Sequence, residues 1–323
     1  MTQSISEFLD TASKHYYAGQ PIISDSQFDY LADMVGYNRL GSTPDRGLTA
    51  KHTYKLYSLQ KYYAGEGKVP LADYTKQKIT TPKLDGAAIS ALDVNGFLTQ
   101  VLKRGDGEVG EVITDKFLLC PDKMLPIYID DLRTIQVTGE VVAPKSIPNA
   151  RNYASGALGL LDTVEFSNRD LYFVAYDCAG IEFDYYTQKL EFLHNLGFNT
   201  VQDTDFCDNF PHDGAVVRVN LQKDYDDLGF TSKHPRGAYA IKSRSEGVPT
   251  TLREVVWSTG RSGKVTPVAI FDPVVIDGAT VSRATLNNPG YIKALDLDIG
   301  DTVFIAKMGE IIPGILRSEK KSS

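Results

Sequence analysis

The sequence predicts a mixed α+β protein with a short helical region, a larger region of antiparallel strands and a final region of short strands. Three observations support this fold class. Apolar residues recur at helical spacing in the first 35 residues, an Asn-Gly pair separates two strand-like runs at residues 87–103, and short β-rich runs follow one another after about residue 245. A chain of 323 residues is too long for one ordinary core, so two or three domains are expected.

The composition indicates a folded globular protein, with 42% hydrophobic and 23% charged residues. No apolar run reaches membrane-spanning length and the first seven residues do not resemble a signal peptide, so no membrane partner is expected. Cys120, Cys178 and Cys207 are widely spaced and provide neither a disulfide framework nor a four-cysteine zinc site. These features favour a cytoplasmic protein.

The charge is unevenly distributed. The formal net charge is −7, yet residues 251–323 carry 9 Lys/Arg against 8 Asp/Glu, so the acidic excess lies in residues 1–250. A nearly neutral C-terminal region can still bind phosphates through local basic patches.

The N-terminal region is predicted to be helical over residues 1–35. Gly19-Gln20-Pro21 interrupts the apolar periodicity, and Ser24 can cap a second helix over 25–34. Residues 36–52 contain Gly36, Gly41, Pro44 and Gly47 and are predicted to be a linker.

The central region is predicted to be an antiparallel α+β domain. Residues 87–94 and 97–103 flank Asn95-Gly96, the strongest short hairpin signal. Further strands are expected over 135–143, 171–178 and 215–220, and helices over 112–119 and 185–196. No Gly-x-Gly-x-x-Gly follows a strand, which argues against a dinucleotide site of the Rossmann type.

The C-terminal region is predicted to be almost entirely β. Five short strands are expected over 255–258, 265–271, 274–276, 279–282 and 302–307, separated by Gly, Pro and Asp. Five such strands in about 70 residues are typical of a small closed barrel such as an OB-fold.

One motif carries the chemistry. Lys83-Leu84-Asp85-Gly86 is followed by Arg104-Gly105-Asp106-Gly107. A lysine at a strand end can attack phosphorus, and a Gly-rich turn can offer an arginine and free backbone amides to phosphate oxygens. The four-residue motif is weak evidence alone, because it occurs by chance in many proteins.

Several further motifs occur in an order that resembles the NAD-dependent DNA ligases. Together with the Lys83 and Arg104 motifs, they are Thr138-Gly139-Glu140-Val141, residues 149–156 (Asn-Ala-Arg-Asn-Tyr-Ala-Ser-Gly), the aromatic run 172–176, Asp213-Gly214 with residues 215–220, and Gly229-Phe230-Thr231-Ser232 leading to Lys242. The resemblance covers nearly the whole chain. It implies a helical domain over 1–50, a nucleotidyltransferase (adenylation) domain over 51–244 and an OB-fold domain over 245–323.

Two stretches resemble the NAD-dependent branch rather than ATP-dependent ligases. Tyr16-Tyr17 with residues 21–29 is similar to the helical domain that grips nicotinamide mononucleotide, and residues 259–269 with 281–288 are similar to the OB domain of that branch. The resemblance assigns Tyr16, Tyr17, Asp25, Phe28 and Asp29 to the nicotinamide end. Tyr17 stands where the family usually has His, Phe28 where it usually has Tyr, and one residue is missing between Tyr16 and Pro21.

The reaction implied by the resemblance is DNA nick sealing in three steps, as used in DNA replication and repair. Lys83 is adenylated by NAD+ with release of nicotinamide mononucleotide, AMP passes to the 5′-phosphate of the nick, and the 3′-hydroxyl displaces it. The lysine must be neutral to attack, and nearby cations such as Arg218 and Lys242 would favour that form.

The resemblance also places the residues around the adenylate and the DNA. The adenylate residues are Ser58, Leu59, Thr81, Asp85, Arg104, Glu140, Tyr176, Val216, Arg218 and Lys242. Tyr176 and Val216 would cover the two faces of adenine. An aromatic residue in a strand is more often part of a core, so Tyr176 rests on the resemblance. DNA contacts are expected from Arg151, Arg236, Arg261 and Lys264.

Three residues depart from the family pattern around the nucleophile. Thr81 replaces an acid two residues before Lys83, Arg218 replaces a lysine, and Gly159 replaces an arginine that contacts DNA or phosphate. The first two affect ligand geometry, since arginine differs from lysine in shape. The third is expected to weaken nick binding.

The implied ligands are NAD+, nicked double-stranded DNA and Mg²⁺, the metal being bound mainly through phosphates and water with Asp85 or Glu140 as possible ligands. No zinc is expected, because larger relatives carry a zinc finger, helix-hairpin-helix repeats and a BRCT domain beyond the point where this sequence ends. A compact viral-type enzyme, a fragment and one subunit of a two-chain ligase all fit that length. An ATP-dependent nucleotidyltransferase and a catalytically inert nick-binding protein remain alternatives.

Overall fold

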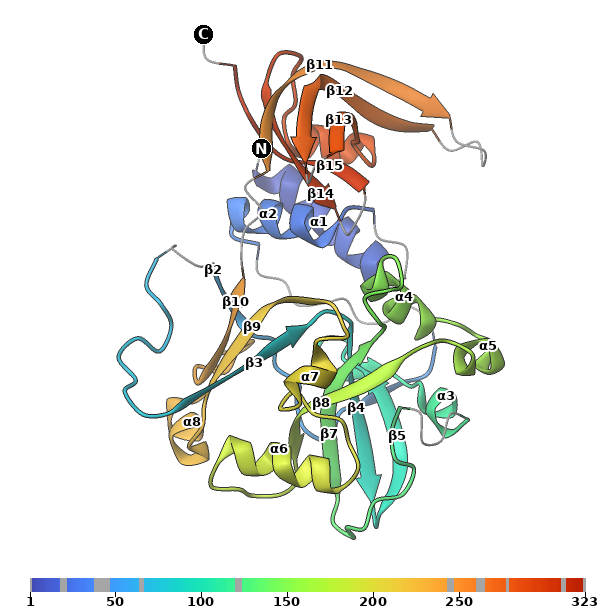
Figure 1. Ribbon diagram of the computed structural model, residues 1–323, viewed down its shortest axis with the longest axis vertical. Coiled ribbons are helices and arrows are strands. Elements are labelled where there is room, and N and C mark those ends of the chain that lie inside the picture. The colour runs from blue at the N-terminus through green and yellow to red at the C-terminus, as the bar shows by residue number, and fades with distance from the viewer. Residues whose placement is uncertain are drawn as a thin grey trace. The chain divides into compact units, whose positions relative to one another are not determined.

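The computed structural model describes residues 2–17, 22–37, 47–63, 67–119, 124–242, 247–259, 265–276, 279–308 and 312–321. The chain forms two compact units (Figure 1). Thr43–Arg244 form one, here called the central unit. Met1–Ser42 and Ser245–Ser323 form the other, here called the terminal unit. The mixed α+β fold class predicted from the sequence is confirmed.

The central unit contains two four-stranded sheets and a two-stranded ribbon. Its strands are β1 (Thr49–Lys51), β2 (Gln60–Tyr63), β3 (Lys78–Leu84), β4 (Ala87–Val94), β5 (Phe97–Lys103), β6 (Val109–Glu111), β7 (Ile135–Val142), β8 (Tyr172–Ala179), β9 (His212–Val219) and β10 (Ala238–Lys242). One sheet has the order β2-β10-β9-β3, the other has the order β5-β4-β7-β8, and β1 pairs with β6. Every pairing is antiparallel except β2 with β10.

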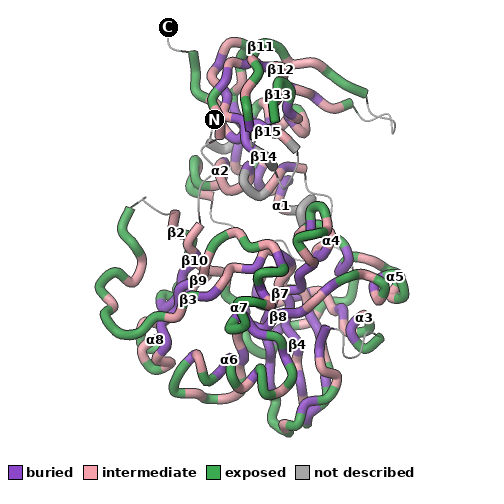
Figure 2. Tube along the Cα trace, viewed as in Figure 1, coloured by how far each residue is buried: buried purple, intermediate pink, exposed green. Residues whose placement is uncertain are grey.

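Helices of the central unit connect and cover these strands. They are α3 (Thr114–Leu118), α4 (Ala150–Ala157), α5 (Thr163–Ser167), α6 (Tyr186–Asn195), α7 (Thr204–Cys207) and α8 (Gln222–Leu228). The largest core lies on the β5-β4-β7-β8 sheet and contains Phe117, Phe166 and Phe173, each almost fully buried (Figure 2).

The hairpin predicted at Asn95-Gly96 is confirmed. β4 and β5 have the predicted bounds, and both turn residues have positive φ, 53° at Asn95 and 83° at Gly96. Paired positive φ values are what a two-residue turn needs to match the twist of its strands.

The terminal unit contains a closed five-stranded barrel with the order β11-β12-β13-β15-β14. The strands are β11 (Val248–Thr259), β12 (Val265–Ile276), β13 (Ala279–Thr285), β14 (Thr302–Met308) and β15 (Ile312–Glu319), and the short helix α9 (Pro289–Ala294) lies between β13 and β14. The predicted closed barrel is therefore confirmed.

Two strand predictions in the barrel were wrong in detail. Residues 265–271 and 274–276 belong to one strand, β12, because the β12–β13 register shifts between Ile270 and Val274 and accommodates Asp272-Pro273 without ending the strand. The sequence analysis also missed β15, whose Pro313 and Gly314 are unfavourable strand residues.

Two N-terminal helices pack on this barrel. α1 (Thr2–Tyr17) and α2 (Asp25–Val35) share a core with it that includes Leu9, Leu31 and Tyr291. Ser24 caps α2 as predicted, through a capping box with Gln27. The helices therefore do not have a core of their own.

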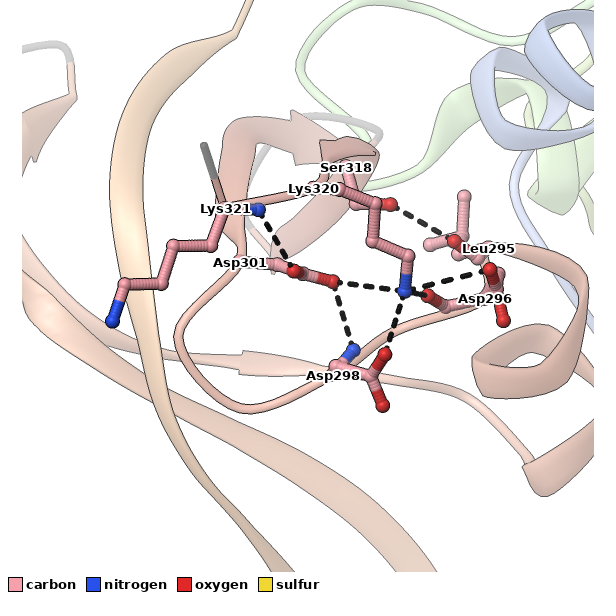
Figure 3. Close-up of polar contacts among 7 residues, drawn as sticks. All are labelled: Leu295, Asp296, Asp298, Asp301, Ser318, Lys320 and Lys321. Atoms are coloured by element: carbon pink, nitrogen blue, oxygen red, sulfur yellow. Dashed lines mark hydrogen bonds and ion pairs between the residues drawn. The ribbon is translucent and has the colours of Figure 1, made fainter. Parts of the chain in front are cut away.

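The end of the described chain is anchored to the barrel by a lysine (Figure 3). The ammonium of Lys320 contacts the carbonyl oxygen of Asp296 and lies 2.8 Å from Asp298 and 3.3 Å from Asp301. The backbone amide of Lys321 donates to the buried Asp301 carboxylate over 3.2 Å.

None of the helices that the structure describes has the length and apolar character needed to cross a bilayer.

Candidate active site

Lys83 lies next to the end of β3, where the β3–β9 register shifts between Pro82 and Leu84. Its Nζ is 2.8 Å from Asp213 Oδ1, and Lys242 Nζ is 2.9 Å from Asp213 Oδ2. Burial alone would raise the pKa of Asp213, but the two ammonium groups outweigh it and lower the pKa to about 2. Lys83, Asp213 and Lys242 are called the lysine cluster below.

The acidic residue of the lysine motif is held by an arginine from another element. Asp85 Oδ1 is 2.7 Å from the Arg151 guanidinium at the start of α4. The next residue, Gly86, packs against β7 so closely that a Cβ there would lie 2.1 Å from the Val141 carbonyl oxygen. The glycine of the motif is thus required by strand packing.

Glu140 on β7 is the second carboxylate near the nucleophile. Burial raises its pKa to about 7, although the charges of Lys83, Arg104 and Arg151 oppose that rise. The preceding residue, Gly139, allows another element to approach the backbone closely. The structure shows that the approaching group is β8, since a Cβ on Gly139 would lie 2.4 Å from the Phe173 ring.

The turn after β5 differs from the expectation of free backbone amides. The Asp106 carboxylate accepts hydrogen bonds from the amides of Glu108 and Val109, at 2.9 and 2.8 Å. The Gly107 amide donates to the Arg104 carbonyl, and the Asp106 amide donates to that of Val109. These four amides already have acceptors within the turn, so the expectation that they bind phosphate was wrong.

Buried His52 supports the same turn. Its Nδ1 is 2.8 Å from the Ser90 hydroxyl and its Nε2 is 3.0 Å from the Arg104 carbonyl oxygen. Burial lowers the pKa of His52, so the neutral ring is favoured. The sequence analysis did not single out His52.

Tyr176 lies at a β-bulge. On β7 the partners shift from Thr138 with Asp177 to Gly139 with Ala175, which leaves Tyr176 as the extra residue of β8. Bulges re-aim side chains and occur often beside active sites. The Tyr176 carbonyl oxygen accepts a hydrogen bond of 2.8 Å from the Tyr186 hydroxyl.

Thr81 and Val216 are direct cross-strand neighbours between β3 and β9, and Val216 also pairs with Ala240 on β10. Residues paired in this way share a face of the sheet. The structure therefore brings two predicted adenylate residues together on one face of the β2-β10-β9-β3 sheet.

Ser58 and Leu59 lie before β2. The Ser58 hydroxyl is 3.1 Å from the Lys233 carbonyl oxygen and 3.0 Å from His234 Nδ1. Leu59 packs against the small core of Val219, Tyr225 and Ala238. Asp213 belongs to a quoted motif but was not assigned a role, and His234 was not singled out at all. Their positions beside predicted residues make both further candidates.

Arg218 has partners other than the lysine cluster. Its guanidinium is 2.8 Å from Asp177, 3.1 Å from Gln222, and lies over the rings of Tyr186 and Tyr225. These hydrogen bonds use two of its three guanidinium nitrogens.

Two parts of the chain match models of known protein domains. Residues 48–212, about half of the chain, match the adenylation domain of NAD-dependent DNA ligases, and residues 249–323 match their OB-fold domain. The chain belongs to the NAD-dependent DNA ligase family.

Individual members of the ligase family are similar over almost the whole chain. The DNA ligase of Flavobacterium johnsoniae is 32% identical over 97% of this chain and 56% of its own length. That of Sulfurimonas denitrificans is 31% identical over 96% of this chain and 57% of its own length. This chain thus spans little more than half the length of these ligases.

One solved ligase aligns weakly. A mycobacterial DNA ligase D complexed with ATP and MES aligns over 82% of this chain and 96% of that chain, with 13% identity and a TM-score of 0.35.

The residues that the ligase resemblance assigns to nicotinamide lie in the terminal unit. Phe28 packs edge-on against Tyr37, with ring centroids 5.8 Å apart, and contributes to the core shared with the barrel. Asp29 also lies on α2. The side chains of Tyr16, Tyr17 and Asp25 are outside the described residues.

The residues predicted to contact DNA are described only in part. Arg151 is paired with Asp85, and Arg236 is exposed, with one guanidinium nitrogen 3.3 Å from the Leu228 carbonyl oxygen. Arg261 and Lys264 lie outside the described residues, between β11 and β12. Gly159 follows α4 and leaves that position without a side chain.

Proposed function

We propose that this chain catalyses NAD-dependent adenylyl transfer at Lys83 and, through it, DNA nick sealing. The observation that carries the proposal is the lysine cluster. One carboxylate holds the motif lysine and a second lysine within hydrogen-bond distance, in a chain of the NAD-dependent DNA ligase family.

The first step is displacement at the adenylyl phosphorus of NAD+. A neutral Lys83 Nζ forms the P–N bond, and the P–O bond to nicotinamide mononucleotide breaks, so that the mononucleotide leaves with the electron pair. We assign Lys242, which is paired with the same carboxylate, to neutralise phosphate charge as the bond breaks. Lys83 loses one proton before the attack and a second as the P–N bond forms. Both protons pass to water, and Asp213 can accept them only transiently because its pKa is about 2.

The remaining residues assigned to the adenylate bind and orient it. We assign adenine to Tyr176 and Val216, with Ser58, Leu59 and Thr81 at its edge, and assign the ribose to Asp85, Glu140 and Arg104. The bulge at Tyr176 and the shared face of Thr81 and Val216 support this assignment.

Mg²⁺ fits this site as an ion held by substrate phosphates and water. No group of three or more His, Cys, Asp or Glu among the described residues could hold a metal unaided. Mg²⁺ commonly uses only one or two carboxylates plus phosphates, which Asp85 and Glu140 can provide. Bound there, it would neutralise charge on the transferred phosphate.

The second and third steps use nicked double-stranded DNA. The nick 5′-phosphate attacks the Lys83 adenylate and releases the lysine, and the 3′-hydroxyl then displaces AMP. Arg151, Arg236, Arg261 and Lys264 are proposed to contact backbone phosphates, which gives register without base readout. Binding should weaken with salt as counterions are released.

The nicotinamide mononucleotide part of NAD+ is proposed to be bound by five residues: Tyr16, Tyr17, Asp25, Phe28 and Asp29. Phe28 retains the aromatic ring of the usual tyrosine but lacks its hydroxyl. The loss of one hydrogen bond costs about 0.5–1.5 kcal/mol, so NAD+ use should survive.

Labelling with NAD+ that carries the label in its adenylate tests the function. We expect one AMP on Lys83, found by peptide mass spectrometry, and none on a Lys83→Ala variant. Lys223→Ala is the matched control, because Lys223 is an exposed helix lysine paired with Asp227. Labelled ATP in a parallel arm tests donor choice.

A chase with nicked duplex then tests transfer and sealing. We propose that adenylation needs this chain alone. Sealed product formed without any added protein would show that sealing needs no second subunit. Normal AMP uptake by the Lys83→Ala variant would overturn the proposed function.

A further inference from the structure

Two guanidinium nitrogens of Arg218 donate hydrogen bonds, and its buried Nε has no hydrogen-bond partner in the described structure. Its guanidinium carbon lies 4.1 Å from the ring centroid of Tyr186 and 4.2 Å from that of Tyr225. The guanidinium donates to Asp177 over 2.8 Å and to Gln222 over 3.1 Å. Only 7% of the side chain is exposed.

These contacts join the two sheets of the central unit. Arg218 is on β9, and Asp177 is on β8 of the other sheet. Asp177 also receives Lys189 of α6 at 2.9 Å. Burial alone would raise the pKa of Asp177, but Arg218 and Lys189 together lower it to about 2, so the ion pair persists at neutral pH.

The same contacts lead directly to Tyr176. Asp177 is the next residue of β8 and forms the last pair before the bulge. Tyr186, whose ring lies against the guanidinium, donates its hydroxyl to the Tyr176 carbonyl oxygen over 2.8 Å. Arg218 therefore restrains the bulge in two ways. It holds the side chain of Asp177 directly, and it contacts Tyr186, which holds the backbone carbonyl of Tyr176.

We infer that Arg218 is a positioning residue that holds the bulged Tyr176 in place to receive adenine, and that it does not itself bind the adenylate. The inference deepens the proposed function and rests on it. This positioning role requires an arginine at residue 218. A lysine would keep the charge, but its single ammonium cannot lie flat between two rings while donating to a carboxylate and an amide.

Two variants test the inference through self-adenylation kinetics. Tyr186→Phe removes only the hydroxyl that reaches Tyr176, and Arg218→Lys restores the residue usual in the family. We expect each to raise the NAD+ concentration for half-maximal rate about three- to tenfold, as expected for one lost hydrogen bond. The rate at saturating NAD+ should change less than about twofold, because the reacting atoms keep their partners.

Arg253→Lys is the matched control, since Arg253 is an exposed barrel arginine paired with Asp272. It should leave both kinetic values unchanged. Thermal unfolding of each variant separates a folding defect from a positioning defect, and Tyr186→Phe carries the test if Arg218→Lys does not fold.

The possible results are distinguishable. An unchanged half-saturating concentration in the folded variants would overturn the inference while leaving the proposed function intact. So would a loss confined to the saturating rate, because that would place Arg218 in the chemical step. Absence of AMP uptake by the unaltered protein would overturn the proposed function and the inference together.

Discussion

At the scale of single residues, the pKa values of carboxylates in the central unit are shifted in opposite directions. Asp213 and Asp177 each contact two cations, which lower their pKa values to about 2. Burial instead raises the pKa values of Glu140 and Asp93 to about 7. For Glu140 three cations oppose the rise, whereas for Asp93 burial is the only cause. The balance between burial and direct charge partners, more than residue type, decides which form is favoured.

Asp93 provides a test of this argument through stability. It is fully buried in β4, and neither carboxylate oxygen has a hydrogen-bond partner within the described structure. Its folded-state pKa of about 7 lies above the unfolded value of about 3.9. The folded state therefore retains the proton, and stability falls as pH rises from about 4 through 7.

We expect Asp93→Asn to stabilise the central unit by about 1–3 kcal/mol at pH 8 and to have little effect at pH 4, because it removes a buried charge. Urea unfolding at several pH values measures this difference. Asp130→Asn, at an exposed position, serves as control. A stability gain that is equal at both pH values would contradict the explanation.

At the scale of elements, strand irregularities place the two central candidate residues. Lys83 lies within the register shift between β3 and β9, and Tyr176 lies at the bulge between β7 and β8. The turn after β5 adds a third irregular feature. Gly105 has a φ of 56°, and a Cβ there would lie 1.9 Å from the Val109 carbonyl oxygen.

Gly105→Ala tests whether this turn positions Arg104. Gly67 is the matched control, since its φ is 64° but nothing lies within 4 Å of its Cβ position. Both changes carry the left-handed backbone cost of about 1–2 kcal/mol. Only Gly105→Ala adds a clash with a backbone carbonyl, so we expect a larger loss of stability and weaker NAD+ binding.

Urea midpoints and half-saturating NAD+ concentrations of the two variants provide the comparison. Equal losses in both variants would show that backbone strain alone, without the clash, explains the effect.

At the scale of the whole molecule, the two compact units do not follow the order of the sequence, because one of them contains both ends of the chain. The sequence analysis divided the chain at residues 50 and 244. In the structure, Met1–Ser42 form one unit with Ser245–Ser323. The physical reason is that α1 and α2 bury their apolar faces against the barrel and share its core.

Buried Gln27 connects these helices to the barrel. Its amide nitrogen donates to the Ile315 carbonyl over 3.0 Å, and its oxygen accepts from Asn287 over 3.0 Å. We expect Gln27→Ala to increase amide hydrogen exchange in α2 and in β15 together, because both lose a buried hydrogen bond. Residues 67–119 of the central unit should be unaffected.

Thr11→Ala is a suitable control, since its hydroxyl bonds only locally to Glu7 on an exposed helix face. Faster exchange in α2 with no change in β15 would show that the helices and the barrel do not unfold as one unit.

Much of the fold could be predicted from local signals. Asn95-Gly96 predicted the hairpin because both positions need positive φ, and Ser24 predicted the start of α2 because its side chain can cap it. β15 could not be predicted from its residues, since Pro313 and Gly314 argue against a strand that barrel closure nevertheless stabilises.

The sequence by itself determined the order of the motifs, the position of the motif lysine and the family to which the chain belongs. These depend on residue identity and spacing, which are local. Only the tertiary structure decided which charges meet. It paired Asp213 with two lysines and turned Arg218 away from them toward Asp177, because partners distant in sequence become neighbours only when the strands that carry them are paired.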